Sequence, residues 1–315
     1  MEVIHGIDHI ERQFRNPVLT IGNFDGVHIG HKSLFQRVKQ VADSLGGESL
    51  VMTFDPHPIK VLYPGNGPPL ITPHEQKVEL IEGEGLDALI VVDFTRELAK
   101  MTAHDFVRVI LYEKIGARAV VVGPDYRFGH KRQGDIPYLQ QLGRKLGFQV
   151  HVVTDLTIDG NAVSSSAIRE LILAGELQKA RGMLGRDYQV SGHVVEGRDR
   201  GGRLLGFPTA NLKLIDELTP KPGVYATEVF IDGERHEGAT NIGYSPTFKD
   251  GAFSVETHII DFSGDIYGKI IQVCFVERIR DEKAFSGPEE LAAQIHKDVQ
   301  RAREILSRHL AESEG

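Results

Sequence analysis

The sequence predicts an α/β protein in two parts: a parallel sheet with covering helices, followed by a small antiparallel β-barrel or sandwich with a C-terminal helix. Three observations predict this in the 315 residues. Up to about residue 180, short apolar runs alternate with stretches of helical periodicity. Helical periodicity then disappears for about a hundred residues, and short alternating runs replace it. From Pro288 the helical pattern returns.

In the first part, four short runs are almost continuously apolar, as is typical of strands buried on both faces of a parallel sheet. They are Val18–Ile21, Leu50–Phe54, Ala88–Val92 and Ala119–Val122. Between the first two, one helical face carries Leu34, Phe35, Val38, Val41, Ala42 and Leu45, and Gly46-Gly47 gives a stop signal. In such a sheet, ligands bind at the carboxyl ends of the strands.

In the second part, the alternating runs are Tyr188–Val195, Gly223–Ile231, Phe253–Phe262 and Lys269–Val276. Asp232-Gly233 and Asp250-Gly251 are strong hairpin signals. The tail then carries Leu291, Ile295, Val299, Ala302, Ile305 and Leu306 on one helical stripe. We place the boundary after residue 184, which gives domains 1–184 and 185–315 with a short junction near Gly182 to Asp187.

Composition excludes several classes of protein. The net charge is −8 and no basic block is present, so we expect no nucleic acid partner. No apolar run approaches the roughly 18 residues of a membrane span, and the polar start is not a signal peptide, so we expect a cytoplasmic protein. Cys274 is the single cysteine and lies in an apolar run, which predicts a buried structural thiol.

The segment from Gly22 to His31, G-N-F-D-G-V-H-I-G-H, follows the first apolar run and leads into the first helix. A helix N-terminus attracts phosphate, and imidazoles at His28 and His31 add donors for charge developing on a phosphoryl group. Gly22, Gly26 and Gly30 let the backbone approach closely. A metal-binding or surface histidine pair is the alternative. A P-loop is excluded because His31 stands where its second glycine is required.

Three further segments fall where a ligand of this sheet would bind. Phe54 and Asp55, within T-F-D-P-H-P, follow the second run, and Asp125, Arg127 and Phe128 follow the fourth. Ser164, Ser165 and Ser166 open a helix that carries Arg169, and hydroxyls with a guanidinium suit a triphosphate. A plain helix cap is the alternative for the serines.

A second constellation lies in the other part. The stretch from Gly197 to Asn211 is rich in glycine, with Gly202 and Gly206, and ends in F-P-T-A-N with Pro208. Exposed amides in such a loop can bind anions, and Thr209 and Asn211 offer oxygen donors for Mg²⁺ beside nucleotide phosphates. Glu256, in a strand-like run, could act as a general base. An ordinary glycine-rich loop and an ordinary surface glutamate are the alternatives.

The histidine segment and the three segments that accompany it resemble the nucleotidyltransferase superfamily with its H-x-G-H motif. Within that superfamily, they resemble the bacterial FMN adenylyltransferase module. The pattern G-x-F-D-G-V-H-x-G-H, T-F-D-P-H-P and R-F-G are all present. Only S-S-T-x-I-R departs, with Ser166 in the threonine position. The second part is similar to riboflavin kinases in G-F-P-T-A-N, P-G-V-Y, N-I-G and V-E, in that order. Nearly the whole chain thus resembles the bacterial bifunctional riboflavin kinase/FAD synthetase family.

That resemblance implies a Rossmann-like nucleotidyltransferase sheet, a barrel of the riboflavin kinase type, and two consecutive reactions. The barrel would phosphorylate riboflavin with ATP and Mg²⁺, with Glu256 as general base and Thr209 and Asn211 holding the metal. The first domain would join FMN to the AMP part of a second ATP, giving FAD and pyrophosphate. His28 and His31 would stabilise the transition state, and Ser165 with Arg169 the leaving group.

Three other functions stay open at this point. One is an adenylyl- or cytidylyltransferase for another small phosphorylated substrate, although that function has no use for the barrel motifs. Another is a flavin sensor without activity. The third is an enzyme that retains only one of the two reactions. The oligomeric state is not specified, and a monomer is compatible with the sequence.

Overall fold

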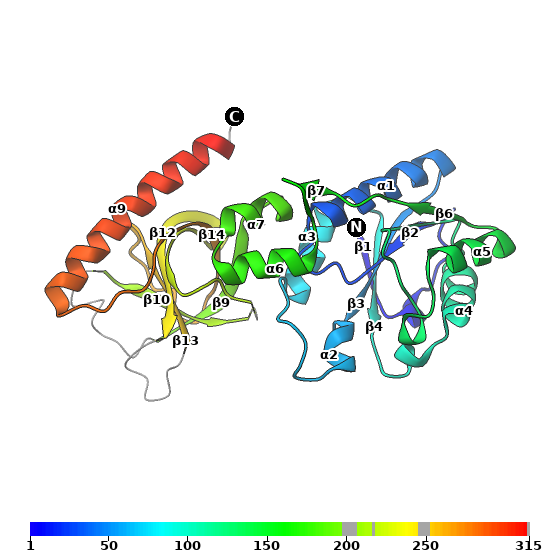
Figure 1. The fold of residues 1–315 in the computed structure, drawn as a ribbon, viewed down its shortest axis with the longest axis horizontal. Helices are drawn as coiled ribbons and strands as arrows, with labels where there is room; N and C mark the ends of the chain where they lie inside the picture. Colours follow the sequence, from blue (N-terminus) through cyan, green and yellow to red (C-terminus); the bar gives the residue numbers. More distant parts are fainter. Residues whose placement is uncertain (197–206, 216–217, 245–252, 314–315) are drawn as a thin grey trace. The chain divides into compact units, whose positions relative to one another are not determined.

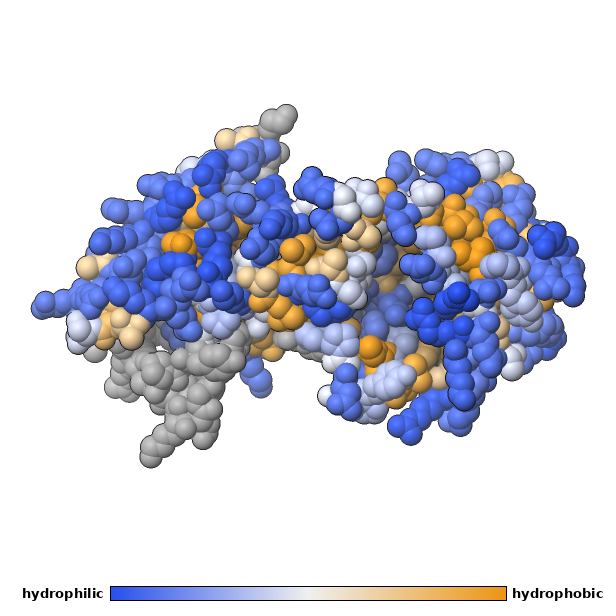
Figure 2. Space-filling model, viewed as in Figure 1, coloured by the Kyte–Doolittle hydropathy of each residue, from blue (hydrophilic) through white to orange (hydrophobic). Residues whose placement is uncertain are grey.

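The computed structural model describes residues 1–196, 207–215, 218–244 and 253–313 (Figure 1). The chain divides into two compact units, Met1–Ser165 and Ser166–Gly315, and each is described by itself. Hydrophilic residues predominate on the face shown in Figure 2, where apolar residues form small groups. Among the residues that the structure describes, no helix has the length and apolar character needed to cross a membrane.

The first unit is built on a six-stranded sheet in which every neighbouring pair is parallel, in the order β1-β4-β3-β2-β5-β6. The chain proceeds from β2 to β3 and β4 on one side, and then crosses back to β5 and β6. The topological switch point therefore lies between β2 and β5, where this class of sheet binds its ligands. The strands are β1 (Glu2–His5), β2 (Val18–Ile21), β3 (Ser49–Asp55), β4 (Ala88–Asp93), β5 (Ala119–Val122) and β6 (Gln149–Val152).

Helices cover both faces of this sheet. On one face, α1 and α3 bury Phe35, Val38 and Ile81 against the strands. On the other, η3, which has π-helical hydrogen bonding, and α5 bury Phe106, Leu111 and Leu139. The helical segments are η1 (Ile7–His9), α1 (Ile29–Leu45), α2 (Pro58–Leu62), α3 (His74–Glu82), η2 (Leu98–Lys100), α4 (Ala103–Asp105), η3 (Phe106–Lys114), η4 (His130–Arg132) and α5 (Ile136–Leu146), and a small hairpin of β7 (Thr157–Ile158) and β8 (Asn161–Ala162) follows.

The four predicted strands of this unit are confirmed as β2, β3, β4 and β5, and α1 ends at Gly46 in the left-handed conformation (φ 56°). The sequence missed β1 and β6. Both lie at the edges of the sheet, and their residues are mostly exposed or half-buried. An edge strand buries less side-chain surface than a central one, so neither segment shows a continuous apolar run.

The second unit contains a closed six-stranded antiparallel barrel in the order β10-β13-β12-β11-β14-β9, so the barrel alternative is confirmed over the sandwich. Its strands are β9 (Tyr188–Val195), β10 (Thr209–Leu214), β11 (Gly223–Ile231), β12 (Glu234–Tyr244), β13 (Phe253–Ile259) and β14 (Ile270–Arg280). Its helices are α6 (Ser165–Ala174), α7 (Leu177–Leu184) and α9 (Pro288–Ser313).

Local sequence signals explain much of this unit. Asp232 (φ 51°) and Gly233 (φ 86°) form the two-residue turn between β11 and β12, as the Asp-Gly signal predicts. Asp250-Gly251 lies outside the described residues. The predicted C-terminal stripe is confirmed, since Ala302, Ile305 and Leu306 of α9 are buried against the barrel.

Two further predictions concern single positions. Cys274 lies in β14 and is buried, as predicted, and burial raises the pKa of its thiol to about 12. The expectation of a loop running to Asn211 was wrong at its end, because Thr209 already begins β10. Strand pairing with β9 and β13 orders this segment, and its own composition does not reveal that partner.

Candidate functional sites

The loop that joins β2 to α1 has an unusual backbone and is tied down on several sides. Phe24 (φ 51°), Gly26 (φ 85°) and Val27 (φ 38°) are all left-handed, which costs about 1–3 kcal/mol for each residue other than glycine. The buried Asp25 carboxylate accepts N–H bonds from Ile71 (2.9 Å) and Thr72 (3.2 Å). These bonds hold the strained loop in place, next to the switch point of the sheet.

His28 and His31 meet at the start of α1. His28 is the N-cap residue and is buried, and its Nδ1 accepts the backbone N–H of His31 at 3.3 Å. In the neutral ring this puts the proton on Nε2, so that nitrogen is a donor. The two imidazoles stack with their centroids 3.5 Å apart. The structure thus brings the two predicted histidines together at a helix N-terminus, where a phosphoryl group is favoured.

At two positions of the motif, neighbouring aromatic rings explain why the residue is glycine. A Cβ on Gly22 would lie 2.9 Å from the Phe24 ring, and a Cβ on Gly30 would lie 3.1 Å from the His28 imidazole. The Phe24 ring in turn meets His31 edge-on, with 5.2 Å between centroids. Glycine at these positions therefore leaves room for the aromatic rings that shape the site.

The end of β3 reaches the same loop. Thr53 Oγ1 donates to the carbonyl of Asn23 at 3.2 Å. Phe54 packs edge-on against Phe94 with 5.6 Å between centroids, and the exposed Asp55 carboxylate lies 3.7 Å from His74 Nδ1. The predicted T-F-D segment thus borders the histidine loop.

The segment after β5 packs two aromatic rings together. Phe128 is buried and stacks on Tyr126, with 5.5 Å between ring centroids, and Gly134 packs so closely that a Cβ there would meet the Phe128 ring at 2.7 Å. Asp125 and Arg127 are exposed, and Arg127 pairs with Asp135 at 3.3 Å. The segment thus combines a largely buried aromatic pair with exposed charged residues.

The serine segment reaches the histidine loop through one residue. Ser165, the first residue of α6, donates from its Oγ to the carbonyl of Asp25 at 2.9 Å. Ser164 precedes this helix. Ser166 and Arg169 follow in α6, within the second compact unit.

Sequence reasoning missed the support that residues 71–77 give this site. Besides the N–H groups of Ile71 and Thr72, the Thr72 hydroxyl accepts from the N–H of Gly26 at 3.1 Å. Lys77 of α3 is buried, with 6% of its surface exposed. Burial lowers the pKa of its ammonium group, and the nearby charges of Asp55 and Asp25 oppose that shift. Lys77 lies one turn before the buried Ile81 on the same face of α3. A lysine on the buried face of a helix was the sequence signal that could have identified it.

In the barrel, neighbouring strands bring polar side chains into one row. Glu256 of β13 is in register with Asn211 of β10 on one side and with Asn241 of β12 on the other. Residues directly opposite in a sheet share a face, so the three project from the same side. Ser254, two residues along β13, donates to Glu256 Oε1 at 3.2 Å.

This row lies on the outer face of the barrel wall. The alternate positions on the same strands, Val255, Thr257 and Ile242, are buried in the interior. On the outer face, His258 Nδ1 bonds the carbonyl of Pro208 at 2.9 Å. Asn241 belongs to the N-I-G motif of the sequence, but only strand register shows that it lies beside Glu256. Gly197, Gly202 and Gly206 lie outside the described residues.

The donor set beside Glu256 suits a hard divalent cation. Thr209 and Asn211 are two residues apart on β10, so they share a face, and both offer oxygen atoms of the kind Mg²⁺ prefers. No group of three or more His, Cys, Asp or Glu side chains able to hold a metal occurs among the described residues. A cation here would be held by few protein ligands and by phosphate oxygens.

The described residues of this unit line two cavities of note. One, of about 370 Å³, is lined by Pro208, Thr209 and Ala210 and by the segment from Phe262 to Tyr267. It therefore adjoins the predicted metal-binding strand, and its wall is partly apolar.

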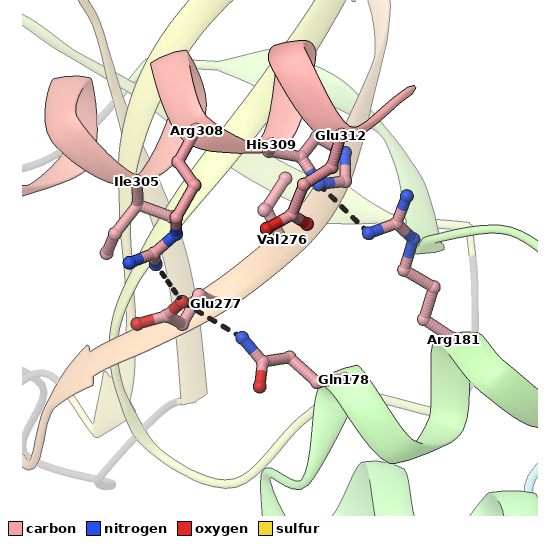
Figure 3. Close-up of a pocket in the computed structure, with 8 residues that line it drawn as sticks. All are labelled: Gln178, Arg181, Val276, Glu277, Ile305, Arg308, His309 and Glu312. Atoms are coloured by element: carbon pink, nitrogen blue, oxygen red, sulfur yellow. Dashed lines mark hydrogen bonds and ion pairs between the residues drawn. The ribbon is translucent and has the colours of Figure 1, made fainter. Parts of the chain in front are cut away.

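The other cavity, of about 500 Å³, lies between α7, β14 and α9 (Figure 3). Arg308 forms an ion pair with Glu277 at 2.7 Å, the Gln178 amide donates to the same carboxylate at 2.9 Å, and Arg181 donates to His309 at 3.2 Å. Among the residues that the structure describes, no predicted site residue lines this cavity.

Comparison with known proteins relates the two parts to two families. Residues 10–167 match the family model described as FAD synthetase, and residues 184–306 match the one described as riboflavin kinase. A bifunctional riboflavin kinase/FMN adenylyltransferase of Haemophilus influenzae is 36% identical over 98% of this chain and all of its own length. One from Listeria monocytogenes is 39% identical over 93% of each chain.

A solved structure from Streptococcus pneumoniae, titled a macrolide-efflux protein, is similar over 96% of this chain and 99% of its own, with a TM-score of 0.86 and 31% identity. The likeness in fold therefore extends over both parts of the chain.

Proposed function

The chain belongs to the bifunctional riboflavin kinase/FMN adenylyltransferase family, and we propose from this premise how its residues divide the two reactions. As an enzyme of this family, the chain phosphorylates riboflavin to FMN with ATP and adenylylates FMN to FAD with a second ATP. We assign adenylylation to residues 1–184 and phosphorylation to residues 185–315. The family models, which match 10–167 and 184–306, support this division.

In adenylylation, a phosphate oxygen of FMN attacks the α-phosphorus of ATP, and the bond from that phosphorus to the pyrophosphate oxygen breaks. His28 and His31 donate to the oxygens on which charge develops, at the N-terminus of α1. The single observation that carries this assignment is the stacked histidine pair on a strained loop held by Asp25. Preorganised donors of this kind act without reorganising during the reaction.

The remaining motif residues bind the two substrates. Ser164, Ser165, Ser166 and Arg169 would hold the leaving pyrophosphate, because hydroxyls and a guanidinium match its oxygens. Gly22, Gly26 and Gly30 let the backbone approach the nucleotide. Phe54 and Phe128 would contact flat rings, and Phe24, Asp25, Asp55, Asp125 and Arg127 would complete the site.

In phosphorylation, Glu256 takes the proton from the 5′-hydroxyl of the ribityl chain, whose oxygen attacks the γ-phosphorus of ATP while ADP leaves. The register of Glu256 with Asn211 and Asn241 supports this role, since two amides flank the carboxylate. Thr209 and Asn211 would hold Mg²⁺, which when bound neutralises phosphate charge. The cavity beside Pro208 and Thr209 is a suitable place for part of ATP, and Gly197, Gly202 and Gly206 would cradle its phosphates.

The experiment is one incubation of purified protein with riboflavin, ATP and Mg²⁺, with flavins, ADP and pyrophosphate quantified over time. FMN followed by FAD is expected. His28→Ala and His31→Ala should lower FAD formation about 10²–10³-fold and leave FMN formation unchanged. Glu256→Gln should lower FMN formation from riboflavin and leave FAD formation unchanged when FMN is supplied. His104→Ala and Glu234→Gln, both at exposed positions, are the controls.

The result would contradict the division if one variant lost both reactions equally. If FMN accumulated without FAD, the first domain would have no adenylyltransferase activity. If riboflavin stayed unchanged while added FMN was adenylylated, the barrel would be misassigned. We also propose a cytoplasmic enzyme without a nucleic acid partner, because the substrates are small molecules and the net charge is −8.

A further inference from the structure

Lys77 is a buried lysine near the histidine loop and belongs to none of the motifs quoted above. Its Nζ donates to the carbonyl of Phe54 at 3.2 Å and to the carbonyl of Asn23 at 3.4 Å. Phe54 is on β3, and Asn23 lies in the loop between Gly22 and Phe24. One ammonium group of α3 therefore joins the end of a central strand to the loop that leads to His28.

The carbonyl of Asn23 is a critical point in that loop. It accepts from Lys77 and also from the Thr53 hydroxyl at 3.2 Å, and it comes directly before the left-handed Phe24. A backbone that is left-handed at Phe24, Gly26 and Val27 persists only when its surroundings fix it. Because His28 follows Val27 directly, the position of its imidazole depends on this conformation.

Opposite charges lie near the Lys77 ammonium group, whereas burial lowers its pKa. Asp25 of the loop and Asp55 of β3 are the carboxylates whose charges act on it, and His74 of α3 is a further titratable neighbour. A buried ammonium is retained at a cost unless nearby groups compensate its charge. Two carbonyls and two carboxylates offset part of that cost here.

We propose that Lys77 is a positioning residue for FMN adenylylation, which fixes the Asn23 carbonyl and thereby the loop that sets the positions of His28 and His31. This inference rests on the proposed role of the two histidines. It assigns Lys77 no contact with substrate. Its loss should lower the rate of the chemical step rather than substrate binding.

The test compares Lys77→Met, which keeps the length of the side chain and removes charge and donors, with Lys77→Arg, which keeps both. Lys39→Met is the matched control, because Lys39 Nζ also donates to a backbone carbonyl, that of Glu84 at 2.5 Å, but far along α1 from the histidines. His28→Ala serves as the reference for a lost catalytic group. For each full-length variant, kcat and KM for FAD formation are measured. Calorimetry gives the number of FMN molecules bound per chain. The rate of FMN formation by the same sample serves as the internal standard.

Lys77→Met should lower kcat for FAD formation about 10–10²-fold, as expected for a small misplacement of catalytic groups. KM and binding stoichiometry should stay within twofold of the wild type, and Lys77→Arg should recover most of the loss. Lys39→Met should behave as the wild type. The inference is overturned if kcat of Lys77→Met is unchanged, if stoichiometry falls together with kcat, if only KM rises, or if Lys77→Arg is as impaired as Lys77→Met. A wild type that forms no FAD, or an active His28→Ala, would instead refute the proposed function.

Discussion

The substitution Gly30→Ala tests whether the position of the His28 imidazole controls FAD formation independently of the stability of the fold. A Cβ at residue 30 would lie 3.1 Å from Nδ1 and Cε1 of His28, whereas ordinary contacts begin at 3.4 Å. The His28 ring must therefore retreat by about 0.3 Å or more. That retreat also lengthens the 3.3 Å bond that its Nδ1 accepts from His31. Since a displacement of about 1 Å can cost about 10²-fold in rate, we expect FAD formation to fall about tenfold.

Stability should stay within about 1 kcal/mol of the wild type, because the better helix propensity of alanine offsets the cost of moving the His28 ring. Gly30 has no left-handed φ and lies in the first turn of α1, where alanine is a better helix former by up to about 1 kcal/mol. The assay measures FAD formation from supplied FMN, FMN formation from riboflavin on the same chain, and Tm. The matched control is Gly182→Ala in α7, where a Cβ would enter open space. FAD formation within twofold of the wild type, or a loss of activity that follows a fall in Tm, would refute the reasoning.

Three further predictions concern buried polar groups. Asp25→Asn should destabilise the first unit by about 1–3 kcal/mol in urea unfolding, because the bonds from Ile71 and Thr72 lose their charged acceptor. Thr240→Val should cost about 1–3 kcal/mol, and Thr240→Ser much less, since the Thr240 hydroxyl bonds those of Thr227 and Thr257 inside the barrel at 2.9 and 3.0 Å; equal losses in both variants would contradict this. Cys274 should resist a thiol reagent at pH 8 in the native protein and react after unfolding. Since its pKa rises from 9.0 to about 12 on burial, the unfolded chain loses the proton first as pH rises above 9.0, so stability should fall with a slope that Cys274→Ala reduces.

Much of the fold could be predicted because its central strands and turns have recognisable local sequence patterns. β2, β4 and β5 are continuous apolar runs, and Gly46 and Asp232-Gly233 meet specific backbone requirements that few other residues meet. The histidine motif was readable for the same reason, since its glycines leave room for neighbouring rings within the motif itself.

Edge strands and long-range supports could not be read in this way. β1 and β6 are half-exposed, and β10 is ordered by pairing with β9 and β13. Asn241 joins Glu256 only through strand register, and a shift by one residue would turn it to the other face.

The sequence by itself determined the two-part α/β and barrel organisation, the resemblance to a two-reaction family, and the residues offered for chemistry. Only the tertiary structure decided that Asp25 is bound by the N–H groups of Ile71 and Thr72 and that Lys77 holds the carbonyl of Asn23. The physical reason is that these contacts satisfy backbone groups about 46 to 54 residues apart in the chain. Hydrogen bonds to backbone atoms depend on where the chain passes and leave little trace in residue type.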